Sequence, residues 1–161
     1  MALFKSTAVF RRITDIDYKY LKENNIDTLL LDVDNTLSTH HGTVLVDGLV
    51  EWLKIMNDNG VKLIVVSNSK KWRIEPFAAK INLPFVSLAL KPLPFGYAKG
   101  VKMAKSPKRN VAIIGDQIFT DVLGANLYGI KSLLVRPVKL EDGWTFKVRR
   151  YFERKLLKDK F

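Results

Sequence analysis

Two aspartates, Asp32 and Asp34, directly follow a short apolar run, Thr28–Leu31. Such a run is typical of a buried strand, and the two acids then lie at its carboxyl end, where open α/β sheets bind ligands. Alternation along an extended chain directs both side chains to one side. Two carboxylates in one small volume repel each other unless a cation separates them or one is protonated. Because hard divalent ions such as Mg2+ take oxygen ligands, the pair predicts metal-assisted chemistry.

Donor groups follow two later apolar runs. Ser67 and Asn68 come after residues 61–66, where a small hydroxyl and backbone N–H groups suit a phosphate oxygen. A turn or a helix cap explains the same two residues equally simply. Lys91 ends the next apolar segment and offers a compact positive charge. Together these residues predict an anion site beside the acidic pair.

A further acidic motif follows residues 111–114. Asp116 can complete an oxygen cage for Mg2+, and Asp121 can orient it or a bound water. Asp121 could instead stabilise the start of its own helix. All four polar sites occur in order, each after a strand-like run, so we expect them to share one edge of a sheet.

The elements that must position these residues alternate between strand and helix. The predicted strands are residues 28–31, 61–66, 85–88, 111–114 and 130–135, and the predicted helices are residues 46–59, 71–81, 95–104 and 120–128. Alternating strands and helices imply a parallel sheet with right-handed crossovers. We therefore predict a single Rossmann-like α/β domain with three α/β/α layers and a mainly parallel five-stranded sheet.

The ordered set of motifs resembles the haloacid dehalogenase-like (HAD) phosphatase superfamily. Its signature is a DxDxT motif, a later Ser or Thr, a Lys and an acidic Gly-Asp motif. Here the motifs read Asp32-Val33-Asp34-Asn35-Thr36, Ser67-Asn68, Lys91-Pro92 and Gly115-Asp116 with Asp121. The Asp-Asn-Thr, Ser-Asn and Gly-Asp-Gln variants look most like the class IIIA, YqeG-type group, which is similar to phosphatidylglycerophosphate phosphatases of mitochondria and plastids.

This resemblance implies a role for each acidic residue. Asp32 would be the nucleophile that forms an aspartyl-phosphate, and Asp34 would protonate the leaving oxygen and then activate water. Mg2+ would be held by Asp32, the backbone carbonyl of Asp34, and Asp116. Asp121 and Thr36 would support this set from close by.

The resemblance also assigns Ser67, Asn68 and Lys91 to the phosphoryl oxygens. Superfamily members often carry a cap domain between these motifs. In this sequence one helix and one strand use most of each interval, so we predict no cap domain. An open site would admit a large or surface-bound substrate.

Composition narrows the class of protein. A chain of 161 residues is long enough for one domain with a substantial core. The sequence contains no cysteine, which excludes disulfides, thiolate metal sites and cysteine nucleophiles. No apolar run approaches the roughly 18 residues that span a bilayer. We therefore predict a cytoplasmic protein, with peripheral contact to a membrane as an open possibility.

The net charge of +11 is concentrated in residues 91–110 and 144–161. Such segments attract anionic lipid surfaces or nucleic acid, although a merely solvated basic surface has the same composition. We divide the chain into a basic amphipathic segment at residues 1–25, a phosphatase domain at residues 26–138, and a basic amphipathic tail at residues 139–161.

The predicted function is that of a Mg2+-dependent phosphomonoester hydrolase in phospholipid biosynthesis, with phosphatidylglycerophosphate as the predicted substrate. A phosphatase for nucleic-acid ends or another phosphomonoester would keep the chemistry and assign the basic surface to polynucleotide phosphates. A non-catalytic, ribosome- or assembly-associated basic protein is the alternative from another class.

Overall fold

A computed structural model describes residues 2–39, 44–138, 147, 151, 154 and 155 of the chain. The predicted tail at residues 139–161 therefore lies almost wholly outside the described residues. The strands are β1 (Ala8–Phe10), β2 (Thr28–Leu31), β3 (Lys62–Val66), β4 (Phe85–Val86), β5 (Val111–Gly115) and β6 (Lys131–Val135). The α-helices are α1 (Tyr18–Glu23), α2 (Leu49–Asp58), α3 (Lys71–Lys80), α4 (Pro94–Ala104) and α5 (Leu123–Tyr128). Short 3-10 turns lie at Ile13–Asp15 and Lys108–Asn110, and a π-helical turn lies at Ile118–Val122.

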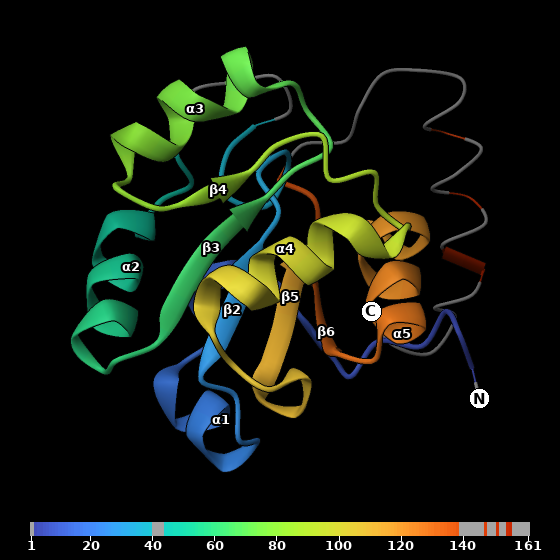
Figure 1. The fold of residues 1–161 in the computed structure, drawn as a ribbon. Coiled ribbons are helices and arrows are strands. Elements are labelled where there is room, and N and C mark those ends of the chain that lie inside the picture. Colours follow the sequence, from blue (N-terminus) through green and yellow to red (C-terminus); the bar gives the residue numbers. More distant parts are fainter. Residues whose placement is uncertain (1, 40–43, 139–146, 148–150, 152–153, 156–161) are drawn as a thin grey trace.

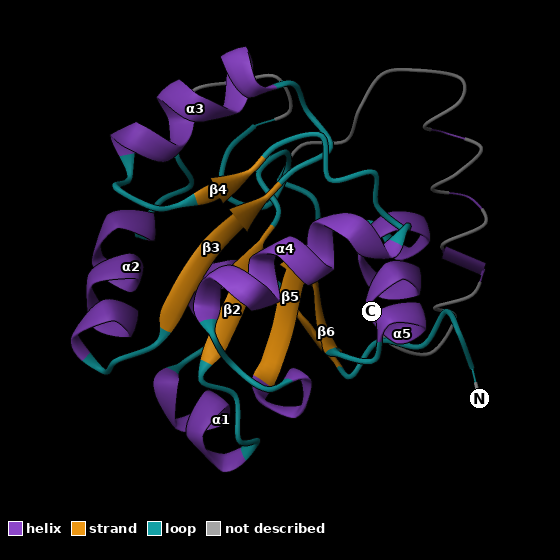
Figure 2. Cartoon of the chain, viewed as in Figure 1, coloured by secondary structure: helices purple, strands orange, loops and turns teal. Residues whose placement is uncertain are grey.

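All six strands are parallel, in the order β1-β6-β5-β2-β3-β4. Figure 1 shows this order from β6 to β4. Side chains alternate across the sheet, so Leu29 and Leu31 pack in one core while Leu30 packs in the other. The first core is covered by α1, α2 and α3, and the second by α4 and α5, which gives three layers (Figure 2). This arrangement confirms the predicted α/β/α fold.

The sheet has six strands where the sequence predicted five. The additional strand is β1, which pairs with β6 in the register Ala8↔Leu133 to Phe10↔Val135. Its three residues are only half-buried, because β1 lies at the edge of the sheet. So short a run among basic residues carries little alternation for a sequence-based prediction to detect.

Two helices also differ from the prediction in detail. The element expected at residues 120–128 is a π-helical turn, Ile118–Val122, that continues into α5. Helix α1 lies in the amino-terminal segment, where the sequence predicted no helix. Both features are local, and the order of strands and helices around them is the predicted one.

One α-helix of the described chain occupies each connection between consecutive strands from β2 to β5. Among the described residues, α2 occupies the β2–β3 connection, α3 the β3–β4 connection and α4 the β4–β5 connection. None of these described connections adds a second layer of strands over the edge, in agreement with the prediction of no cap domain. Within the described part of the chain, no helix combines the length and apolar character needed to cross a bilayer.

Candidate active site

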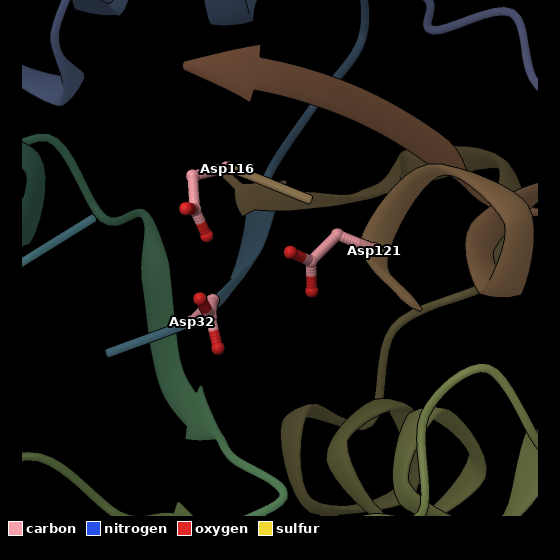
Figure 3. A group of neighbouring side chains, drawn as sticks. All are labelled: Asp32, Asp116 and Asp121. Atoms are coloured by element: carbon pink, nitrogen blue, oxygen red, sulfur yellow. The ribbon is translucent and has the colours of Figure 1, made fainter. Parts of the chain in front are cut away.

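Three aspartates converge at the carboxyl edge of the sheet (Figure 3). Asp32 follows β2, Asp116 follows β5, and Asp121 lies in the π-helical turn after β5. One carboxylate oxygen from each residue lies within 4.8 Å of the others. Because β2 and β5 are neighbours in the sheet, their carboxyl ends bring residues distant in sequence together. The predicted convergence of Asp32, Asp116 and Asp121 is therefore present.

Lys91 lies between two of these carboxylates. Its Nζ donates hydrogen bonds to Asp32 Oδ1 at 2.8 Å and to Asp121 Oδ1 at 2.7 Å. Asn68 holds the lysine from behind, because its amide accepts from the Lys91 backbone N–H at 2.7 Å and donates to the Lys91 carbonyl at 3.1 Å. Asn68 thus fixes the backbone from which the Lys91 side chain extends.

The centre carries an excess of negative charge. Burial, together with the carboxylates of Asp121 and Asp34, raises the pKa of Asp32 to about 7, although Lys91 opposes the rise. Burial alone would lower the pKa of Lys91, but the carboxylates of Asp121 and Asp32 outweigh it and raise that pKa. One ammonium thus faces more carboxylate charge than it can neutralise. A donor set of three buried oxygen ligands with excess negative charge fits a hard divalent cation.

Asp34 has a partner that the sequence did not reveal. Arg73, in the first turn of α3, makes a two-pronged ion pair with it: Nη1 donates to Asp34 Oδ2 at 3.0 Å, and Nη2 donates to Oδ1. Nη1 also donates to Ser69 Oγ. The carboxylate of Asp34 therefore turns toward α3, whereas that of Asp32 turns toward Lys91. Only the backbone of Asp34 was predicted as a metal ligand, and its side chain is outside the acidic centre.

Backbone turns place the smaller polar groups around Asp32. Asn35 adopts the left-handed conformation, with φ of 59°, which asparagine tolerates and which turns the chain sharply after β2. Thr36 Oγ1 then lies 3.5 Å from Asp32 Oδ2 as a donor. Ser67, at the end of β3, is buried, and its Oγ accepts from the Ser69 backbone N–H at 3.1 Å.

Two glycines allow the acidic centre to close. At Gly115 a Cβ atom would overlap the carboxylate of Asp121, so only glycine admits this approach. Gly124 leaves room in the same way for the ring of Tyr97. Tyr97 is fully buried and its hydroxyl donates to the Thr120 carbonyl at 2.6 Å, which fastens the π-helical turn that carries Asp121.

A cavity of about 380 Å3 opens beside Thr36. Its lining includes three arginines, Arg11 and Arg12 after β1 and Arg136 after β6, opposed by one acid, Asp47. Because all strands are parallel, these arginines lie at the same edge of the sheet as Asp32. This grouping could not be predicted from the sequence, since it depends on the pairing of β1 with β6.

Known proteins resemble this chain in sequence and in fold. A model of the HAD-hydrolase-like family matches residues 88–141. Probable phosphatase YqeG of Bacillus subtilis (strain 168) is 34% identical over 147 residues, which cover 91% of this chain and 86% of that protein. An uncharacterized protein from Listeria monocytogenes serotype 4b superposes with a TM-score of 0.62 at 18% identity, over 74% of this chain and 84% of that one.

A third similarity is to the deoxy-D-mannose-octulosonate 8-phosphate phosphatase of Haemophilus influenzae, solved in a cobalt-bound form. Its TM-score is 0.50 at 20% identity, over 85% of this chain and 90% of that one. Both structural matches are similarities of fold.

Proposed function

This chain belongs to the HAD-like hydrolase superfamily and is a phosphatase, and from that premise we propose that it is a Mg2+-dependent phosphomonoester hydrolase with Asp32 as its nucleophile. The observation that carries this proposal is the position of Asp32. It lies at the carboxyl end of a central strand, hydrogen-bonded to a buried lysine and within a cluster of carboxylates. A phosphoryl group placed there would meet an oxygen nucleophile and the positive charge of Lys91 together.

The oxygen donors of the site suit Mg2+. Asp32 and Asp116 would supply carboxylate ligands, Asp34 its backbone carbonyl, and Asp121 would support the set while holding Lys91. When bound, the cation would neutralise charge that develops on the phosphoryl oxygens.

The first chemical step is the transfer of the phosphoryl group to Asp32. An Oδ atom of Asp32 forms a bond with phosphorus while the bond from phosphorus to the ester oxygen breaks. Lys91 and the hydroxyl of Ser67 receive the phosphoryl oxygens. Asp34 gives its proton to the departing ester oxygen, which leaves as an alcohol.

The second step is hydrolysis of the aspartyl-phosphate. Asp34, now ionised, takes a proton from a water molecule, whose oxygen bonds to phosphorus as the bond to Asp32 breaks. Inorganic phosphate leaves, and both aspartates return to their starting state. Arg73 is a positioning residue in this scheme, because its two hydrogen bonds hold the carboxylate of Asp34 beside the site.

We propose phosphatidylglycerophosphate as the substrate, a lipid that carries a phosphomonoester and a phosphodiester. Support comes from the cavity beside Thr36, whose arginines Arg11, Arg12 and Arg136 suit a second phosphate. The net charge of +11 favours a substrate held in an anionic surface.

An assay of phosphate release tests this proposal directly. The full chain is incubated with Mg2+ and either phosphatidylglycerophosphate in anionic liposomes or a panel of soluble phosphomonoesters, with Asp32→Asn as control. Lipid turnover that the control loses would support the proposal. Turnover of soluble or nucleic-acid phosphates alone would keep the chemistry and reject the lipid substrate.

A further inference from the structure

Five large apolar side chains are exposed on the two segments that follow β3 and β4. Their exposed fractions are 74% for Trp72, 56% for Leu88, 54% for Leu90, 51% for Leu93 and 61% for Phe95. Single exposed leucines are common on protein surfaces, but a group of this size at one place is typical of an interaction site. We call these five residues the apolar rim.

Backbone hydrogen bonds place the rim against the loops of the site. Leu88 N–H donates to the Ser69 carbonyl and Ala89 N–H to the Ser67 carbonyl, both at 2.9 Å. Gly96 N–H, in the first turn of α4, donates to the Ala89 carbonyl at 3.2 Å. The segment from Leu88 to Phe95 is therefore fastened to the loop that follows β3.

The remaining member of the rim, Trp72, lies on the first turn of α3. The next residue, Arg73, contacts Asp34, so this turn also borders the site. The rim is consequently built from two segments: the first turn of α3, which follows Ser67, and residues 88–95, which include Lys91.

The backbone of this segment holds the leucines outward. Leu88 and Leu90 have φ of 47° and 57°, in the left-handed region that leucine rarely occupies. Their side chains are exposed, while Ala89 and Lys91 between and beyond them are buried. Strained backbone of this kind is concentrated at binding and catalytic sites. The same backbone conformation thus exposes the two leucines and places Lys91 in the acidic centre.

Exposed lysines also precede one member of the rim. Lys70 and Lys71 are exposed immediately before Trp72. Large apolar side chains bordered by lysines are complementary to the headgroup region of an anionic bilayer, which accepts apolar groups and attracts cations.

We propose that the apolar rim inserts into the surface of an anionic bilayer and docks the carboxyl edge of the sheet against it. This inference rests on the proposed function, because the role of the docking is to bring Asp32 to a phosphomonoester at the bilayer surface. The docking itself involves no turnover and can be measured separately.

Co-sedimentation with vesicles tests the docking. The full chain is mixed with vesicles of equal parts phosphatidylglycerol and phosphatidylcholine, and with vesicles of phosphatidylcholine alone. The double variant Leu88→Ser/Phe95→Ser removes two rim residues, and Ile55→Ser, on α2 and 52% exposed, is the matched control. We expect the double variant to lower the partition coefficient on anionic vesicles at least about tenfold, and Ile55→Ser to leave it unchanged.

A second pair of variants tests the contribution of charge. Lys70→Gln and Lys71→Gln should each lower partition on anionic vesicles about fivefold and leave partition on neutral vesicles unchanged. Turnover of a soluble phosphomonoester by the rim variant should equal that of the unmodified chain, because neither substituted residue touches the acidic centre.

Equal partition of the rim variant and the unmodified chain would overturn the inference. So would a dimer in light scattering that the rim variant abolishes, since a second copy would then cover the rim. Loss of phosphatidylglycerophosphate turnover with intact vesicle binding would count against the proposed substrate and support the docking surface.

Discussion

At the scale of single residues, Lys91 holds the acidic centre together. Its side chain is 2% exposed, and its ammonium is hydrogen-bonded to two carboxylates that are otherwise close enough to repel each other. A buried charge that loses its partner costs more than the pair contributes, because the remaining charge keeps its desolvation penalty. Lys91 should therefore matter for folding as well as for chemistry.

Replacing Lys91 with Met is expected to lower the free energy of unfolding by about 3–5 kcal/mol, because Asp32 and Asp121 would face each other without a counter-charge. Phosphate release should fall below detection. Urea denaturation of the variant beside Lys99→Met, an exposed lysine on α4, measures the difference. A Lys91→Met variant as stable as Lys99→Met would contradict this account of the centre.

Arg73 positions Asp34 through two parallel hydrogen bonds, which a lysine cannot reproduce. We expect Arg73→Gln and Arg73→Lys each to lower kcat about 100-fold with little change in the unfolding midpoint. Steady-state kinetics on a soluble phosphomonoester provide the measurement. Full activity in Arg73→Lys would show that charge alone suffices and would remove the positioning role.

The sequence predicted the acids of the site because each follows a recognisable strand. It missed Arg73, whose neighbours Lys70 and Lys71 make the stretch look like a solvated basic turn. Spacing along the chain also could not show that Asp34 would turn away from Asp32, since that depends on where α3 begins in space. Contacts between different elements thus could not be predicted from the sequence, whereas the acidic residues within each motif could.

At the scale of elements, the site depends on how β5 passes into the π-helical turn Ile118–Val122. Asp121 points back along the strand because Gly115 leaves room for its carboxylate, and Tyr97 of α4 fastens the turn through the Thr120 carbonyl. A π-helical turn widens the backbone and is frequent at functional sites. The sequence predicted a helix here but not this widened start, because propensity does not distinguish the two.

Gly115→Ala tests this element directly. The added methyl group would displace the Asp121 carboxylate, so we expect the affinity for Mg2+ to fall about tenfold or more. Titration of the folded variant with Mg2+ in a calorimeter measures it, and circular dichroism establishes that the fold is retained. Unchanged affinity would mean that Asp121 can hold its role from another position.

The strand order was predicted from the sequence only in part. Alternating helices and buried strands predicted the parallel sheet and the shared carboxyl edge, which the structure confirms. The edge strand β1 was not predicted, and with it the arginine-lined cavity went unseen, because Arg11 and Arg136 meet only when β1 pairs with β6. Long-range pairing of a three-residue strand leaves almost no local signal.

At the scale of the whole molecule, a strongly basic chain encloses a locally acidic centre. The net charge of +11 contrasts with the cluster of Asp32, Asp116 and Asp121, where burial and the neighbouring carboxylates raise the pKa of Asp32 to about 7. The long-range field therefore attracts anionic substrates, while the short-range field favours a cation. A phosphatase that must bring a phosphate ester and a divalent ion together needs both.

Metal affinity should consequently depend on pH. In the metal-free protein Asp32 is mostly protonated at pH 6 and mostly ionised at pH 8, because its pKa is raised to about 7. A cation favours the ionised form and lowers that pKa, so binding releases a proton. We expect Mg2+ to bind about tenfold more tightly at pH 8 than at pH 6, by calorimetry in buffers of different ionisation enthalpy. A dependence that persists in Asp32→Asn would point to another group.

The most direct test of the central claim is to detect phosphate on Asp32. The variant Asp34→Asn, with Mg2+ and an aryl phosphate whose leaving group needs no proton, should complete the first step and stall at the second. After an acid quench, mass spectrometry should find a phosphorylated peptide that contains Asp32, and Asp32→Asn in the same background should yield none. Turnover by Asp32→Asn, or phosphate on a different residue, would contradict the account.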